Sequence, residues 1–427
     1  MPIRRMKMEV ILAGIVIFTA VATILRVNQL FFMLATIILL PIVAQVVGRA
    51  SVAGIDARRD APGEATAGEV LDVRVSLRNI GWFRKFSLQV EDELSPWLEP
   101  QGAAGAIVPG LMSGEPAEIT YRVRALKRGV HRIGPLRVLA SDPLGLREYW
   151  RRIDVADKIL VYPCPFALPT FRFTATESLA HVFRRKRIPE PDGMDFHRLR
   201  EYVPGDDLRR VHWRTTARRG KFTVIDYEDT EVVDVGIALD LSRGCDIGSG
   251  RHTAEEYGVD LAASLAKRAL QLRGSVRLLA VGTQDRSQPE RSGATAFQPI
   301  LDALARVESG AAVPFAELLG RWSVGCKPGT AAVIISPSGD EALVDVVRRL
   351  AAARVHVNVV FLDPNSFADY ATTHGLRLSA GQRAVAQGPA RAAAHAEHLR
   401  AAGAVVYTVR CGDDLPSRLV VASELVA

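Results

Sequence analysis

Residues 232–241 read Val-Val-Asp-Val-Gly-Ile-Ala-Leu-Asp-Leu, a mostly apolar run of strand length in which Asp240 is the next-to-last residue. Such a run is typical of a strand that is buried on both faces, as in a parallel sheet covered by helices. The following segment supplies a covering helix, because apolar residues recur at helical spacing. These positions are Tyr257, Leu261, Leu265, Ala269 and Leu272. Strand and helix together predict the start of a doubly wound α/β domain.

The alternation of strand and helix continues through residues 232–427. Further buried-strand runs are 276–281, 331–335, 355–362 and 404–409, and the helical patterns between them are 297–307, 341–353 and 389–402. Ligands of a doubly wound sheet bind beyond the carboxyl ends of the strands, where the strand order reverses. The loop at Asp240 is therefore the first candidate for a functional site.

Residues 51–165 have a different pattern, in which apolar and polar residues alternate over short runs. The apolar positions are Leu71, Val73, Val75 and Leu77, then Phe86, Leu88 and Val90, and later Tyr121 and Val123. Turn sequences such as Asn79-Ile80-Gly81 and Ile133-Gly134-Pro135 separate the runs. Short alternating strands with such turns predict an antiparallel β-sandwich that ends near residues 159–162.

Two uncharged apolar runs, residues 10–25 and 30–47, lie at the start of the chain. Each approaches the length that crosses a hydrocarbon core of ~30 Å, so residues 1–50 are predicted to form a transmembrane helical hairpin. The first run also has the form of a signal peptide, with Ala20-Val21-Ala22 as a cleavage motif. A buried core hairpin is a weaker alternative, because no globular core needs two adjacent uncharged runs of this length.

Basic residues set the expected orientation of this hairpin. They are Arg4, Arg5 and Lys7 before the first run, Arg49, Arg58 and Arg59 after the second, and the single Arg26 between them. By the positive-inside rule, both chain ends and the soluble domains are expected on the cytoplasmic side of the membrane.

Composition and motifs exclude several function classes. The excess of Lys+Arg (54) over Asp+Glu (47) suits an anionic surface but does not choose between lipid, nucleic acid and acidic protein. The four cysteines lie far apart, which indicates neither a zinc site nor a disulfide framework. The sequence has no Walker loop, HExxH or Gly-x-Ser-x-Gly motif, so ATPase, zinc protease and serine hydrolase activities lack their chemistry.

Residues 195–214 hold the densest run of unusual residues, Asp-Phe-His-Arg-Leu-Arg-Glu-Tyr-Val-Pro-Gly-Asp-Asp-Leu-Arg-Arg-Val-His-Trp-Arg. Pro204-Gly205 predicts a turn, Asp206 a helix cap, and Trp213 a buried anchor before a basic loop at 215–221 and a strand at 222–226. Two interpretations stay open. The segment 166–231 is either a connector held by Arg–carboxylate pairs or a surface recognised by a partner, since Arg and Trp are favoured interface anchors.

This segment resembles the hallmark of the domain of unknown function 58 family. The matching residues are Arg200, Tyr202, Pro204, Gly205 and Asp206, followed by Arg209, Trp213 and Arg218. The chain order is similar too, with Lys127-Arg128-Gly129 in the preceding domain. The resemblance implies a multi-domain fold of two transmembrane helices, an antiparallel β-sandwich and, at 232–427, a doubly wound von Willebrand factor A-like domain.

The resemblance also implies a class of function. Members of this bacterial family are often encoded beside a MoxR-type AAA+ ATPase and a membrane transglutaminase-like protein. The expected function is that of a membrane-anchored, non-enzymatic adaptor or scaffold that acts through protein–protein interaction. Those two proteins and the lipid bilayer are the expected partners, and neither nucleic acid nor a cofactor is expected.

A von Willebrand factor A-like domain raises the question of a metal site. Domains of this kind that bind a cation use Asp-x-Ser-x-Ser, a Thr from a second loop and an Asp from a third. This sequence keeps Asp240 and Ser242, and Thr295 is a candidate third ligand, whereas Gly244 replaces the second Ser and Ser336 stands where the Asp is expected. The lost hydroxyl and carboxylate remove much of what offsets the dehydration of Mg²⁺, so the site is expected to be degenerate.

Two rival functions follow from other residues. Asp206, Asp226 and Glu228 beside the basic residues 209–221 suggest a Mg²⁺-dependent nuclease, although no Lys stands two residues after Glu228. The block Arg184-Arg185-Lys186-Arg187 suggests binding to an anionic lipid surface, unless it is simply a solvated loop.

Overall fold

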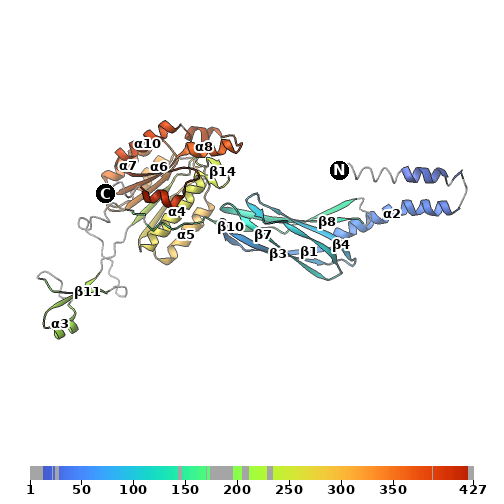
Figure 1. Ribbon diagram of the computed structural model, residues 1–427, viewed down its shortest axis with the longest axis horizontal. Coiled ribbons are helices and arrows are strands. Elements are labelled where there is room, and N and C mark those ends of the chain that lie inside the picture. The colour runs from blue at the N-terminus through green and yellow to red at the C-terminus, as the bar shows by residue number, and fades with distance from the viewer. Residues whose placement is uncertain are drawn as a thin grey trace.

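The computed structural model describes residues 13–21, 23–24, 28–142, 147–169, 171–173, 196–203, 211–227, 234–386 and 388–421. A long helix, a domain of two sheets and a domain with a parallel sheet follow one another along the molecule (Figure 1). A small unit of β11 (Phe196–Glu201), α3 (Trp213–Arg219) and β12 (Thr223–Tyr227) lies apart from them in the same view. We call it the hallmark unit.

The long helix is α2 (Asn28–Val52). Its segment Gln29–Val52 is the one helix in the described part of the chain that is long and apolar enough to cross a membrane. At 1.5 Å per residue, this segment spans about 36 Å, against ~30 Å for a bilayer core. Residues 13–21 and 23–24 of the first apolar run are helical as well, whereas Arg26 and Val27 of the expected turn lie outside the described residues.

The last turn of α2 packs against the next domain. Lys85 on β4 (Lys85–Leu94) is buried, and its ammonium group donates a 2.5 Å hydrogen bond to the carbonyl of Ala50. A cation here satisfies a carbonyl that the helix end leaves free. Gly48 lies against the ring of Tyr149, to which an added Cβ would come within 2.3 Å. Direct contacts therefore join helix and domain.

Residues 55–162 form the two-sheet domain. One sheet has the order β1-β3-β7-β5 and the other β2-β10-β8-β4-β6, with β9 paired to β8. The strands besides β4 are β1 (Ile55–Asp60), β2 (Glu64–Thr66), β3 (Val70–Asn79), β5 (Leu98–Pro100), β6 (Gly105–Leu111), β7 (Pro116–Ala125), β8 (Gly129–Ser141), β9 (Glu148–Ile153) and β10 (Asp157–Tyr162). Val73 and Leu77 from one sheet and Leu88 and Val138 from the other are fully buried in one shared core, as their alternation predicts.

The alternation fails at the start of β4. It predicts that Phe86, Leu88 and Val90 share a buried face, but Phe86 is exposed. Ser87 has a φ of 47°, in the left-handed region that residues other than glycine rarely adopt. This residue shifts the alternation, so that Lys85 points inward and Phe86 outward.

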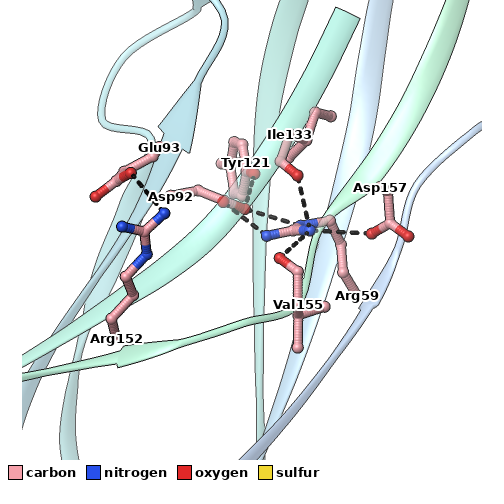
Figure 2. A network of polar contacts seen from close by, with 8 residues as sticks. All are labelled: Arg59, Asp92, Glu93, Tyr121, Ile133, Arg152, Val155 and Asp157. Atoms are coloured by element: carbon pink, nitrogen blue, oxygen red, sulfur yellow. Dashed lines mark hydrogen bonds and ion pairs between the residues drawn. The ribbon is translucent and has the colours of Figure 1, made fainter.

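One buried polar network connects the two sheets (Figure 2). Arg59 on β1 pairs with both oxygens of Asp92 on β4, at 2.7 and 2.9 Å. The Nη1 group of Arg59 donates to Asp157 and to the backbone carbonyls of Ile133 and Val155. The hydroxyl of Tyr121 on β7 donates a 2.5 Å hydrogen bond to Asp92. The side chains of Arg59 and Asp92 are fully buried. Because an unpaired buried charge is costly, this pairing fixes how the sheets sit against each other.

Residues 235–421 form the parallel-sheet domain. Its sheet has the order β17-β16-β13-β18-β19-β20, and the described pairings are parallel except that of β17 with β16. The strands are β13 (Val235–Leu239), β16 (Ser275–Ala280), β17 (Gln288–Ser292), β18 (Ala331–Ser336), β19 (His356–Leu362) and β20 (Val405–Val409). The helices are α4 (Ala254–Gln271), α5 (Phe297–Arg306), α6 (Phe315–Ser323), α7 (Glu341–Ala352), α8 (Pro364–Thr373), α9 (Ala380–Val385), α10 (Pro389–Ala401) and α11 (Leu415–Val421). Neighbouring residues such as Ile237 and Ala238 belong to separate cores on opposite faces of the sheet.

The predicted α/β alternation is confirmed, because each predicted strand overlaps an observed strand and its two ends differ from the observed ends by at most three residues. The sequence pattern does not predict β17, α6, α8, α9 or α11. Strand β17 reads Gln-Pro-Glu-Arg-Ser and contains no apolar periodicity, so only its pairing along β16 identifies it.

The described residues that follow β10 pack against the parallel-sheet domain. Phe171 and Phe173 are buried in its core, where the ring centroid of Phe171 lies 5.5 Å from that of Tyr407. Asn358 donates a 2.9 Å hydrogen bond to the carbonyl of Phe173. The sequence places this stretch in the connector 166–231, whereas its aromatic residues belong to the domain core.

Candidate functional site

The strand order reverses between β13 and β18, which creates a switch point in the parallel sheet. Asp240 directly follows β13, and Ser336 is the last residue of β18. The two strands are parallel neighbours, so these residues meet at the carboxyl edge of the sheet. This edge is where doubly wound sheets place their ligands.

The carboxylate of Asp240 is bound by groups of its own chain. One oxygen accepts a 2.6 Å hydrogen bond from the hydroxyl of Ser336, and the other accepts a 3.0 Å bond from the backbone N–H of Ser242. The Ser336 hydroxyl in turn accepts from the N–H of Ser338 at 2.9 Å. Asp240 is buried, and these bonds offset the cost of burying its charge. The arrangement holds the loop after β13 in one conformation.

Cys245 lies buried in the same loop. Burial, together with the adjacent Asp240 carboxylate, raises the pKa of its thiol well above the usual value. The thiol is therefore protonated at neutral pH, whereas a nucleophilic cysteine must supply a thiolate. Its position argues for packing and against covalent chemistry.

The residues at this edge do not fit a magnesium site. Gly244 has a φ of 95°, and a Cβ added there would lie 2.7 Å from the backbone of Gly381 on α9. The position of the second Ser therefore has no room for a side chain. Ser336 supplies a hydroxyl in place of a carboxylate, and Mg²⁺ favours a near-octahedral shell that includes carboxylate oxygens. Within the described residues, no three His, Cys, Asp or Glu side chains are grouped to hold a metal ion.

The assignment of Thr295 to this site is wrong. Strand β17 runs antiparallel to β16, and its last residue Ser292 pairs with Ser275, the first residue of β16. Thr295, in the short helix η3 (Ala294–Ala296), therefore follows the amino edge of the sheet, opposite the candidate site. The residue that forms a backbone β-bridge with Ser242 is Ala311, which has no side-chain oxygen.

The hallmark unit has a well-defined local structure. Strands β11 and β12 are antiparallel, and α3 lies between them in the chain. His212 caps α3, because its ring Nδ1 accepts a 3.2 Å hydrogen bond from the N–H of Thr215. The hydroxyl of Thr216 accepts from the N–H of Thr223 at 3.0 Å, which ties the helix to β12. The basic loop predicted at 215–221 is therefore largely helix.

Aromatic side chains line the outside of this unit. Trp213 is 63% exposed and Phe222 is 53% exposed, with their ring centroids 6.3 Å apart in an edge-to-face arrangement. Tyr202 lies 6.0 Å from Phe222. The prediction that Trp213 is a buried anchor is wrong in this structure. Arg218 is exposed in the last turn of α3, so basic and aromatic groups share one small unit.

Other predicted residues cannot be placed. Outside the described residues lie Pro204, Gly205, Asp206, Arg209, Glu228 and the block Arg184 to Arg187. Arg200 and Asp226 are strand residues whose side chains are not described. The nuclease and lipid hypotheses built on these residues stay predictions.

A second polar site, which the sequence does not predict, joins the two larger domains. Arg128 of the two-sheet domain is buried, and its guanidinium donates to the carbonyl of Val307 at 2.7 Å and to Glu255 on α4 at 2.5 Å. Lys127 lies 3.5 Å from Glu256 on the same helix. In the sequence, only the Lys127-Arg128-Gly129 turn and the acidic first turn of α4 hint at this ion pair. A periodic pattern is local and cannot show that two segments 127 residues apart come into contact.

The acidic face of α4 is tightly enclosed at this joint. Burial raises the pKa of Glu256, and burial together with the charge of Glu256 raises the pKa of Asp260 to about 7. The backbone N–H of Cys164, just after the two-sheet domain, donates a 3.2 Å hydrogen bond to Asp260. The joint thus contains an acid that titrates near neutral pH.

Part of the chain is similar to a family of known sequences. Residues 198–368 match the model described as "Protein of unknown function DUF58". The match confirms the resemblance carried by the hallmark residues, because the matched stretch contains Arg200, Trp213 and Arg218. One relative, the uncharacterized protein YeaD of Bacillus subtilis (strain 168), is 25% identical over 265 residues, 60% of this chain and 64% of that protein. The chain therefore covers less than two thirds of the length of that relative.

Two solved structures are similar to part of this chain at low sequence identity. The CARDB domain of PF1109 from Pyrococcus furiosus has 14% identity and a TM-score of 0.19, over 25% of this chain and 94% of that chain. The alpha-2-macroglobulin of E. coli has 19% identity and a TM-score of 0.20, over 28% of this chain and 8% of that chain. Likeness at this level carries no argument about fold or function.

Proposed function

We propose that this protein is a non-enzymatic adaptor, anchored in a bacterial inner membrane, that acts through protein–protein interaction. The observation that carries the proposal is the exposed aromatic and basic surface of the hallmark unit. Trp213 and Phe222 are more than half exposed beside Arg218, within the segment that matches the family. Trp, aromatic and Arg side chains supply most of the binding energy in protein interfaces.

The anchor in this proposal is a hairpin of two transmembrane helices, the second of them α2. The length and composition of α2 support it, as does the helical conformation of residues 13–21 in the first run. The positive flanking residues favour cytoplasmic placement of both termini and of the soluble domains. The contacts of α2 with the two-sheet domain would transmit the position of the membrane to the rest of the molecule.

For the soluble part, we propose a β-sandwich followed by a von Willebrand factor A-like domain. Two sheets that enclose one core support the first. The order β17-β16-β13-β18-β19-β20 supports the second, because numbered along the chain it is the 3-2-1-4-5-6 order of doubly wound domains. The internal bonds of Asp240 and the protonated thiol of Cys245 favour a binding role over catalysis.

The proposed partner is an acidic protein surface with an apolar pocket, which complements Trp213, Phe222 and the arginines of α3. The family resemblance suggests a MoxR-type AAA+ ATPase as this partner and a membrane transglutaminase-like protein as another member of the assembly. Cytoplasmic soluble domains are a condition of this proposal, since a cytoplasmic ATPase could not otherwise reach them.

Affinity capture from native membranes tests the proposal. A tagged full-length chain should retain an AAA+ ATPase. The double variant Trp213→Ser with Phe222→Ser should retain at least tenfold less of this ATPase than the wild type. The control is Trp150→Ser, which changes a tryptophan that is 66% exposed on the two-sheet domain. Equal retention by all three proteins would refute the role of the hallmark surface.

A further inference from the structure

A second exposed apolar surface lies at the end of the two-sheet domain that holds α2. It consists of residues 80–86, Ile-Gly-Trp-Phe-Arg-Lys-Phe, which we call the Trp82 loop. Trp82 is 89% exposed and Ile80 is 68% exposed. Two neighbouring side chains of this size in water are unfavourable, so the loop is a candidate for a surface that is covered in the cell.

The loop is fastened directly to the end of α2. The N–H of Ile80 donates a 2.9 Å hydrogen bond to the carbonyl of Gly54, two residues beyond the helix. Lys85 donates to the carbonyl of Ala50 within its last turn, at 2.5 Å. Asn79 accepts from the N–H of Gly81 at 3.0 Å and shapes the turn between these two attachments. The exposed side chains are therefore held beside the place where the apolar helix meets the domain.

The conformation of the loop turns its aromatic groups outward. The left-handed Ser87 directs Phe86 away from the core. The ring of Phe83 makes edge-to-face contacts with Trp82 at 5.9 Å and with Phe86 at 6.4 Å. These three rings form one continuous apolar group that is supported from within the loop. Such a preformed group can enter an apolar medium without reorganisation.

The charges of the loop suit an anionic surface. Arg84 is exposed and its guanidinium lies 5.1 Å from the centroid of the Phe86 ring, so cation and aromatic ring are presented together. Arg49, exposed on the last turns of α2, adds a second positive charge. Lys85 does not contribute, because its ammonium group is buried, which lowers its pKa, and bound to the helix end.

We infer that the Trp82 loop lies in the headgroup region of an anionic bilayer and seats the two-sheet domain on the leaflet from which α2 emerges. Tryptophan favours this interface because its ring is apolar and its N–H is polar, and arginine pairs with lipid phosphates. We favour lipid over a protein partner because the loop lies beside the end of α2, a helix of membrane-spanning length. The hydrogen bond from Ile80 to Gly54 joins the two. The inference rests on the proposed transmembrane role of α2.

Tryptophan quenching by brominated lipid tests this inference in the full-length chain. The chain has five tryptophans, and none lies in residues 1–52, so α2 itself contributes no signal. We expect vesicles of brominated phosphatidylcholine with phosphatidylglycerol to quench the wild type, and Trp82→Phe to remove at least half of that quenching. Trp97→Phe is the control, because the ring of Trp97 lies 5.1 Å from Lys127 at the opposite, interdomain end of the domain.

The outcomes separate the loop from the anchor. If the chain resists alkaline extraction from vesicles but Trp82→Phe is quenched as strongly as the wild type, the loop inference fails and the anchor proposal stands. If the chain is extracted by alkali, both fail. If Trp82→Phe leaves lipid quenching unchanged but abolishes capture of a membrane protein, the loop is a protein-binding surface and the lipid assignment is overturned.

Discussion

The Asp240 loop buries polar residues, whereas the hallmark unit exposes aromatic ones. The loop carries an aspartate, serines and a cysteine, groups that suggest chemistry, yet they are bonded to one another and closed off by α9. The hallmark unit carries a tryptophan and a phenylalanine, groups that suggest a core, yet both are exposed. The contrast indicates that the parallel-sheet domain uses its polar residues for structure, while apolar residues outside it are available for contacts.

The largest expected effect tests whether buried polar groups are structural. Arg128→Ala removes the cation that pairs with the buried Glu255 at 2.5 Å, whereas Glu256 keeps Lys127, so we expect a loss of roughly 3–5 kcal/mol in the unfolding free energy. Arg122→Ala is the matched control, because Arg122 forms a 3.1 Å pair with Asp72 in which both side chains are largely exposed. Exposed pairs contribute about 0–1 kcal/mol. Urea unfolding of both variants in detergent measures the difference, and equal stabilities would contradict it.

The next prediction concerns the degenerate metal motif. Gly244→Ser restores the Asp-x-Ser-x-Ser pattern, but the new side chain would meet the backbone of Gly381 at a left-handed position. We expect a loss of roughly 2–4 kcal/mol from strain and overpacking, and no rise in melting temperature with Mg²⁺. A magnesium-dependent rise in the variant would instead show that the loop has kept its ability to bind a cation.

How far the sequence predicts this molecule depends on whether a pattern is local. The strands from 232 onward are identified because runs such as Ile237 to Leu239 are buried on both faces and therefore wholly apolar. Thr295 is misplaced because the antiparallel direction of β17 is set by pairing with β16, which no local pattern records. Arg59 looks like a charge that flanks the membrane segment in the sequence. It is a buried ion-pair partner of Asp92 because β1 and β4 come together in the fold, which no local pattern records.

The site residues show the same division. The importance of Asp240 follows from its place at the end of a buried strand, a local feature. That Ser336 would bond to its carboxylate depends on two strands 96 residues apart becoming neighbours. The exposure of Trp213 depends on which surfaces α3 meets, and a tryptophan in a sequence is more often buried than not.

A smaller effect should appear in the pH dependence of the interdomain joint. Burial raises the pKa of Asp260 to about 7, well above its value in an unfolded chain. Between about pH 4 and pH 7 the folded state keeps a proton that the unfolded state has lost, so this group makes stability fall as pH rises. Asp260→Asn removes the penalty and should stabilise the protein by about 1–3 kcal/mol at pH 8, and less at pH 5. Melting curves at both pH values, with Asp72→Asn as an exposed control, decide whether the gain has this pH profile; a gain that is equal at both would assign it to another cause.

The smallest expected effect is also the one that most directly tests the contrast between the two regions. Trp213→Ala should change the unfolding free energy by less than about 0.5 kcal/mol, because an exposed ring loses little burial on truncation. Trp322 is the matched comparison: it is buried on α6, and its ring lies so close to Gly236 that a Cβ there would come within 2.4 Å. Trp322→Ala should therefore cost about 3–5 kcal/mol. If urea unfolding gives the two tryptophans similar costs, Trp213 is a core anchor after all. The partner surface would then have to lie elsewhere than on the hallmark unit, and the capture of an ATPase should survive any change at Phe222 that leaves the fold intact.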